Sequence, residues 1–92
     1  MKTTERFGRK CVWQPLNGGD RWRYKFANGY GASVVQSPMS YGGESGLYEL
    51  AVLDSDGDLD YSTPITNDVV GHLDGPGVWR VLAAIEDLAV DA

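Results

Sequence analysis

The chain has 92 residues, 42% of them hydrophobic, and a formal net charge of −5, so we expect one small folded domain and exclude an intrinsically disordered chain. No apolar run approaches the roughly 20 residues of a membrane-spanning helix, and residues 1–10 lack the apolar stretch of a secretory signal. The single cysteine, Cys11, excludes an internal disulfide and a multi-cysteine zinc site, and this composition indicates a cytoplasmic protein.

The first twenty residues are a poorly defined N-terminal segment, in which only residues 11–16 have the composition of a strand. Cations and aromatic rings then alternate along residues 21–26. This period of two predicts a strand that directs its rings to the core and its cations to the other face. Asn28-Gly29 follows, and this dipeptide is typical of a type I′ hairpin turn, in which both central residues need positive φ. Residues 30–36 are then the returning strand.

Two further strands are predicted after a glycine-rich loop at residues 37–46. Residues 47–53 form the first of them, and an acidic turn spans residues 54–57. Residues 58–65 form the second, which ends where Pro64 interrupts the pairing. Strands joined by such short turns make an antiparallel meander.

The last third of the chain changes to a helical period. Thr66 is a good N-cap for a short helix that ends at Leu73, and residues 74–77 interrupt the helical pattern. A second helix then runs over residues 78–90, with apolar residues at i, i+3, i+4 and i+7.

The predicted fold is α+β, with one antiparallel sheet of about four strands and two helices packed on one face. It is a single domain over residues 1–92, in which the meander spans residues 21–65 and the helical part spans residues 66–90.

Charge is distributed unevenly along the chain. Residues 1–25 carry seven cations and two carboxylates, whereas residues 26–92 carry one cation and eleven carboxylates. An acidic surface of this kind can occupy a cationic groove built for nucleic acid, so we expect the partner to be a protein that handles nucleic acid. The carboxylates predicted to contact the partner are Glu44, Glu49, Asp54, Asp56, Asp58, Asp60, Asp68 and Asp74. The competing interpretation is that these charges only keep a small protein soluble.

The alternating carboxylates from Asp54 to Asp60 also suggest a calcium-binding loop. An EF-hand loop that began at Asp54 would need glycine at its sixth position and glutamate at its twelfth, where this chain has Leu59 and Ile65. We therefore predict no metal site and no cofactor.

The alternative binding site is a basic surface of Arg21, Arg23 and Lys25, which could contact nucleic acid. Strict alternation places the rings of that strand on the opposite face, and the acidic remainder of the chain repels phosphate. We therefore expect no direct binding of nucleic acid by this protein. An enzyme is not predicted either, because the sequence has no phosphate-binding loop or hydrolase motif, and its only histidine, His72, lies far from Cys11 along the chain.

Three segments, FANGYGASVV (26–35), SYGGESGLYELAVL (40–53) and YSTPITNDVVGHL (61–73), resemble small proteins encoded by bacteriophages and prophages. The resemblance covers residues 22–73, extends loosely to the final helix and leaves out the first twenty residues. It implies the cytoplasm of a bacterial host cell and an accessory role, such as blocking a host defence. It implies no catalytic residues.

These features predict a non-enzymatic phage accessory protein that binds a host protein. The most specific form of this hypothesis is an acidic, nucleic-acid-mimicking inhibitor of a CRISPR–Cas system. The alternatives are a phage structural or housekeeping protein and a weak nucleic-acid binder that acts through its basic N-terminal region. If the carboxylates do not carry the binding, the loop with Pro38, Met39 and Tyr41 is the next candidate, because an exposed methionine and tyrosine adapt to a partner.

Overall fold

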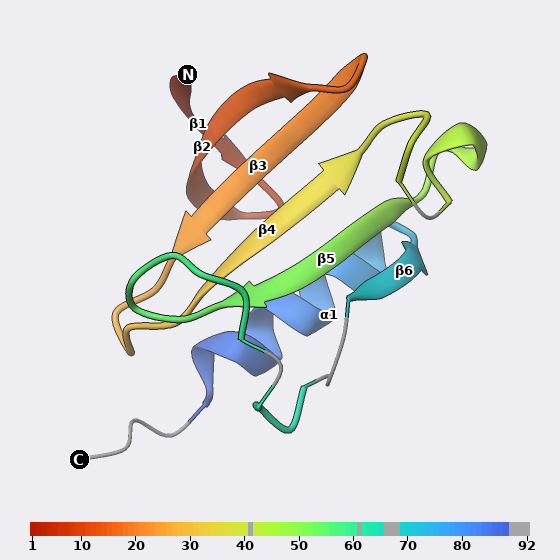
Figure 1. Cartoon of the computed structure of the whole chain (residues 1–92). Coiled ribbons are helices and arrows are strands. Elements are labelled where there is room, and N and C mark those ends of the chain that lie inside the picture. The colour runs from red at the N-terminus through yellow and green to blue at the C-terminus, as the bar shows by residue number, and fades with distance from the viewer. Residues whose placement is uncertain (41, 61, 66–68, 89–92) are drawn as a thin grey trace.

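A computed structural model describes the whole chain except residues 41, 61, 66–68 and 89–92. Within the described residues, six strands form one antiparallel sheet in which each strand pairs with the next along the chain (Figure 1). The strands are β1 (Lys2–Arg6), β2 (Arg9–Leu16), β3 (Gly19–Lys25), β4 (Gly31–Gln36), β5 (Tyr48–Leu53) and β6 (Val70–Leu73). The α-helix α1 spans Gly75–Glu86, and a short 3-10 turn, η1, spans Gly43–Ser45. No helix in this part of the chain is long and apolar enough to cross a membrane.

The predicted fold of four strands and two helices is wrong, because the described chain has six strands and one α-helix. Two of the additional strands, β1 and β2, lie in the N-terminal segment. The turn that follows β1 has Phe7 and Gly8 at φ of 55° and 75°, and the turn that follows β2 has Asn17 and Gly18 at 50° and 79°. Two central residues with positive φ are the mark of a type I′ turn, whose twist matches that of paired strands. Asn17-Gly18 therefore carries the hairpin signal that the prediction assigned to Asn28-Gly29.

The third additional strand is β6, which replaces the first predicted helix. Val70–Leu73 pairs antiparallel with β5, and His72 has a φ of 57° where the pairing is irregular. Val70 is β-branched and Gly71 is a poor helix former, so pairing with the edge of β5 overrides a weak helical pattern. The predicted N-cap of that helix, Thr66, lies outside the described residues.

The predicted strand at residues 58–65 is also wrong. Among the described residues of this segment, Leu59 alone forms a β-bridge, and its partner is Leu53. The carboxylate of Asp60 accepts hydrogen bonds from the backbone N and the hydroxyl of Ser62 at 2.9 and 2.6 Å. Local hydrogen bonds of this kind compete with strand pairing, so the edge of β5 is left to β6.

The second predicted helix is present as α1, although it begins at Gly75 instead of Val78 and ends at Glu86, and residues 89 and 90 of the prediction lie outside the described residues. The carboxylate of Asp74 accepts a hydrogen bond from the backbone N of Gly77 at 2.7 Å and so caps the helix. Pro76 lies in the first turn, where its missing N–H is tolerated. The helix residues that are completely buried against the sheet are Val78, Leu82 and Ile85.

The predicted separation of rings and cations along β3 is confirmed. Trp22 and Tyr24 are buried in the core that α1 covers, whereas the alternate residues Arg21, Arg23 and Lys25 lie on the opposite face. We call these faces the helix side and the open side of the sheet. The buried core on the helix side consists of Cys11, Trp22, Tyr24, Ala32, Val34, Tyr48, Leu50, Val52, Val78, Leu82 and Ile85.

Between β3 and β4, residues 27–29 form a three-residue loop closed by Phe26 and Tyr30, which is not the predicted type I′ turn. The backbone N of Gly29 donates to the carbonyl of Phe26 at 3.1 Å, and the backbone N of Phe26 donates to the carbonyl of Tyr30 at 2.8 Å. Gly29 has a φ of 91°, but Asn28 does not have a positive φ. The connection is therefore a type I turn followed by a glycine in the left-handed region.

Replacing Gly29 with valine is expected to lower the free energy of unfolding by about 1 kcal/mol or more, because a β-branched residue is strained at positive φ. The control is Ala27→Val in the same loop, where the side chain is exposed and φ is not positive. Urea denaturation measures both variants. A Gly29 variant as stable as the parent would contradict this turn geometry.

Candidate functional site

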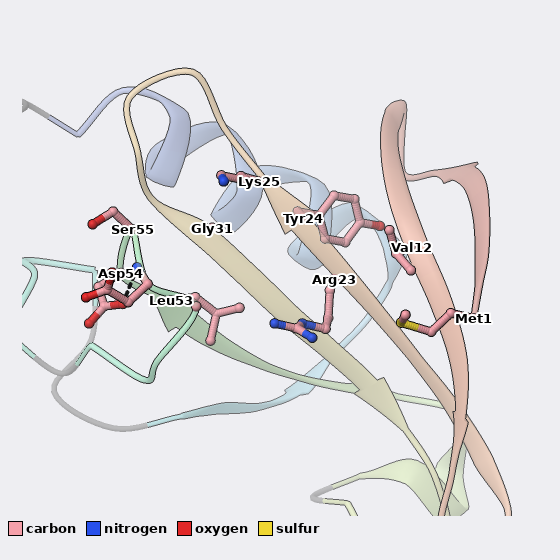
Figure 2. Close-up of a pocket in the computed structure, with 11 residues that line it drawn as sticks. Met1, Val12, Arg23, Tyr24, Lys25, Gly31, Leu53, Asp54 and Ser55 are labelled. Carbon is pink, nitrogen blue, oxygen red and sulfur yellow. Dashed lines mark hydrogen bonds between the residues drawn. The ribbon is translucent and has the colours of Figure 1, made fainter.

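The open side of the sheet carries a cleft of about 320 Å³ beside the turn that follows β5 (Figure 2). The residues that line it are Met1, Val12, Arg23, Tyr24, Lys25, Gly31, Leu53 and residues 54–57. The strand order brings them together, because Arg23 lies opposite Val12 on β2 and Lys25 lies opposite Gly31 on β4. Val12 and Leu53 are apolar residues of the cleft and lie on opposite sides of Arg23, with Leu53 next to the turn and Val12 near Met1 (Figure 2).

The guanidinium of Arg23 has no hydrogen-bond or ion-pair partner among the residues that the structure describes. It lies on the same side of the sheet as Met1 and Leu53 in Figure 2. One of its nitrogens would be 3.3 Å from a Cβ atom placed on Gly57, so Arg23 approaches the turn without pairing with a carboxylate. Its five N–H donors are therefore available to a ligand in the cleft.

The other two cations of the predicted basic surface, Arg21 and Lys25, differ from Arg23 in their contacts and exposure. Arg21 donates to the hydroxyl of Ser33 at 3.0 Å, and burial together with the charge of Arg23 lowers the pKa of Arg21. Lys25 is exposed at the end of β3. The rings of β3 lie on the helix side, so this basic surface has no aromatic platform of its own strand.

The carboxylates of Asp54, Asp56 and Asp58 gather in one tight turn, which we call the acidic turn (residues 54–58). Each offers an oxygen, and these three atoms lie within 4.8 Å of one another. One oxygen of Asp54 accepts hydrogen bonds from the backbone N atoms of Asp56 and Asp58 at 2.9 and 3.0 Å. The side chains of Asp56 and Asp58 are exposed. Ca²⁺ takes about six to eight oxygen ligands, so the three carboxylates would supply only part of a calcium site.

The remaining predicted carboxylates do not join the acidic turn in one surface. Asp60 is next to it, and its hydrogen bonds from Ser62 lower the pKa of Asp60. Glu49 lies on β5 opposite Val35, and Glu44 lies in η1, which precedes β5, whereas the acidic turn follows that strand. Asp74 caps α1, and Asp68 lies outside the described residues.

The carboxylates of the acidic turn form no salt bridge with a cation among the described residues, although Arg23 and Lys25 line the same cleft. Across the described parts of the chain, the pair of Arg9 and Glu86 is the one salt bridge, at 2.6 Å. The carboxylates of the acidic turn therefore face solvent without a direct basic partner. Clustered like charges repel one another, and a cationic partner would relieve this repulsion.

Cys11 and His72 do not form a nucleophile and base pair. Cys11 is buried in the core on β2, and this burial raises the pKa of its thiol, which disfavours the reactive thiolate. His72 is exposed on β6, at the far edge of the sheet.

Sequence reasoning missed the apolar part of the cleft. Val12 belongs to a segment treated as poorly defined, and the alternation of β2 places it on the face opposite to Cys11. Leu53 was assigned correctly to a strand, but only the strand order places it beside Arg23 and the acidic turn.

No known protein family, curated protein or solved structure matches this chain. The resemblance to phage and prophage proteins therefore stays a prediction.

Proposed function

We propose that this protein is a non-enzymatic binding protein that attaches to a basic surface of a partner protein through the acidic turn and Asp60. The observation that carries the proposal is the cluster of three carboxylates whose oxygens lie within 4.8 Å of one another and which form no salt bridge with the described residues. Complementary charge of this kind accelerates association and selects cationic surfaces.

The cleft next to the acidic turn adds a second feature that a partner can use. A basic side chain of the partner placed against Asp54 or Asp56 would have Leu53 beside it. Val12 lies farther along the cleft, beyond Arg23 (Figure 2). A neighbouring apolar side chain of the partner can pack on Leu53, and the partner's backbone carbonyls can accept hydrogen bonds from Arg23. The partner segment that fits best is therefore basic and apolar in alternation.

A cationic groove of a nucleic-acid-handling complex offers such basic side chains to the acidic turn. The carboxylates do not follow one another as a regular row, because the turn folds them together. They stand in for one compact anionic group of a nucleic acid, and not for a length of its backbone. The resemblance to phage proteins supports the bacterial cytoplasm as the setting and a host defence complex such as CRISPR–Cas as the target.

The test begins with the partner, captured from a bacterial host lysate with the tagged protein and identified by mass spectrometry. The binding of the purified partner is then measured for the variant with Asp54, Asp56, Asp58 and Asp60 all replaced by asparagine. We expect a reduced association rate and affinity, and binding by the parent that weakens as salt rises. Asparagine keeps the side-chain oxygen that Asp54 and Asp60 use within the turn, so stability should change little.

The matched control removes the same number of charges elsewhere, at Glu5, Glu44, Glu49 and Asp87. These side chains make no hydrogen bond or ion pair among the described residues. If the control variant loses as much affinity as the acidic-turn variant, only net charge matters and the proposed site is wrong. Binding that is insensitive to salt would point instead to the apolar loop at Pro38 and Met39, where Met39 is 79% exposed.

A further inference from the structure

The N-terminal hairpin places cations and aromatic rings on the same face of the sheet, unlike β3. A pocket of about 440 Å³ opens on the helix side over strands β1 to β4, whereas α1 packs mainly against β4, β5 and β6 (Figure 1). We call it the N-terminal pocket. Its lining includes Lys2, Thr4 and Arg6 from β1, Trp13 from β2, Trp22 from β3 and Gln36 from β4.

The register of the strands explains why these residues meet. Lys2 lies opposite Trp13, and Trp13 lies opposite Trp22. Residues that are directly opposite in neighbouring strands share a face, so an ammonium group and two indole rings form one row across the sheet. Proteins bind single-stranded nucleic acid on surfaces that carry both groups, because the bases stack on the rings and the phosphates contact the cations.

The groups of the pocket are held in place. The guanidinium of Arg6 lies 4.5 Å from the ring centroid of Trp22 and donates to the hydroxyl of Tyr48 at 2.8 Å. The indole N–H of Trp13 donates to the carboxylate of Asp20 at 2.8 Å, which fixes the orientation of that ring. A fixed ring loses little conformational freedom when a base stacks on it.

Lys2 supplies a free charge at the rim of the pocket. Its side chain is exposed, and it has no hydrogen-bond or ion-pair partner in the part of the chain that the structure describes. Trp13 is partly exposed beside it. Asp20 disfavours phosphate at its own end of the pocket and can accept a hydrogen bond from the amino group of a base.

We propose that the N-terminal pocket binds single-stranded nucleic acid, with a base stacked on Trp13 and the adjacent phosphates bound by Lys2 and Arg6. This site goes beyond the proposed protein-binding function, because it lies on the helix side and the acidic turn borders a cleft on the open side. A protein with both sites contacts a nucleic-acid-handling complex through its acidic turn and an exposed strand of nucleic acid through the opposite face.

The test uses fluorescence polarisation with labelled oligothymidylate and oligouridylate of about 10 nucleotides, within the range of sites on small sheet domains. We expect both to bind at low salt and to weaken as salt rises. An unlabelled DNA duplex should compete poorly, because its bases are not available for stacking. A difference between the two oligomers distinguishes DNA from RNA as the ligand.

Two exposed lysines provide a matched pair of variants. Lys2→Glu changes the charge of the N-terminal pocket, and Lys25→Glu makes the same change in net charge on the open side. We expect Lys2→Glu to weaken binding at least about fivefold and Lys25→Glu to weaken it less than about twofold, since only the first removes a direct phosphate contact. Equal losses in the two variants would overturn the proposal, as would the absence of binding at low salt.

Tryptophan fluorescence tests the stacking contact separately. Bound oligonucleotide should quench the emission of the parent, and Trp13→Phe should abolish most of that quenching while it keeps an aromatic ring and part of the affinity. Quenching that persists unchanged in Trp13→Phe would show that the base does not stack on this residue and would overturn the assigned site.

Discussion

Replacing Leu82 with alanine is expected to lower the free energy of unfolding by about 2–5 kcal/mol, the range for removing a large aliphatic side chain from a core. Leu82 is completely buried at the centre of the face that α1 presents to the sheet. Among the described residues α1 is the one α-helix, so no second helix can close the cavity that the substitution leaves. Urea denaturation monitored by circular dichroism measures the loss.

Leu59 provides a control with the same change in side chain. Its side chain is 53% exposed, although its backbone bridges to Leu53. Leu59→Ala should cost less than about 0.5 kcal/mol, as surface substitutions usually do. Similar losses for the two variants would contradict the packing of α1 on the sheet.

Replacing Asn28 with alanine is expected to lower the free energy of unfolding by about 1–3 kcal/mol, because it leaves helix carbonyls without a donor. The side-chain amide of Asn28 donates to the carbonyl of Ile85 at 2.8 Å, and longer hydrogen bonds reach Glu86 at 3.2 Å and Leu88 at 3.3 Å. Its oxygen accepts from the backbone N of Tyr30 at 3.0 Å. One side chain thus joins the turn after β3 to the end of α1.

A second variant, Asn28→Asp, separates the donation to the helix carbonyls from the acceptance of the hydrogen bond from Tyr30. Aspartate keeps the oxygen that accepts from Tyr30 but removes the amide donors, and it places a negative charge near the C-terminus of a helix, where the macrodipole disfavours it. At neutral pH we expect Asn28→Asp to be at least as destabilising as Asn28→Ala. Asn17→Gly, in an exposed turn, is the control and should change stability by a few tenths of a kcal/mol. An aspartate variant as stable as the parent would contradict the role of Asn28 at the helix end.

The two candidate binding surfaces depend to different degrees on the attachment of α1 to the sheet, which Leu82 and Asn28 provide. The acidic turn and the N-terminal pocket lie on opposite faces of the sheet, and each is built from neighbouring strands. Loss of the helix would expose the core rings Trp22 and Tyr48, which support Arg6 in the N-terminal pocket. The acidic turn is held mainly by its own hydrogen bonds, so a destabilised variant that still folds should keep its protein binding.

Features that depend on a few neighbouring residues could be predicted from the sequence alone. The alternation of residues 21–26 determined which side chains of β3 are buried, because successive side chains of a strand point to opposite faces. The apolar stripe after residue 77 determined that a helix forms there, whereas residues 74–77, which were predicted to interrupt the helical pattern, form its N-cap and first turn. The turn signal at Asn17-Gly18 is equally local, and it lies between residues 11–16 and 21–26, which both have strand character.

Features that depend on pairing across the sheet were decided only by the tertiary structure. Residues 70–73 carry a weak helical pattern, and they form β6 because the edge of β5 offers backbone partners that no local preference can match. The carboxylates of residues 44–74 read as one acidic surface, yet the fold places η1 and the acidic turn at opposite ends of β5. The meeting of Arg23 with the acidic turn, and of Lys2 with Trp13, follows from strand order and register, which long-range packing determines.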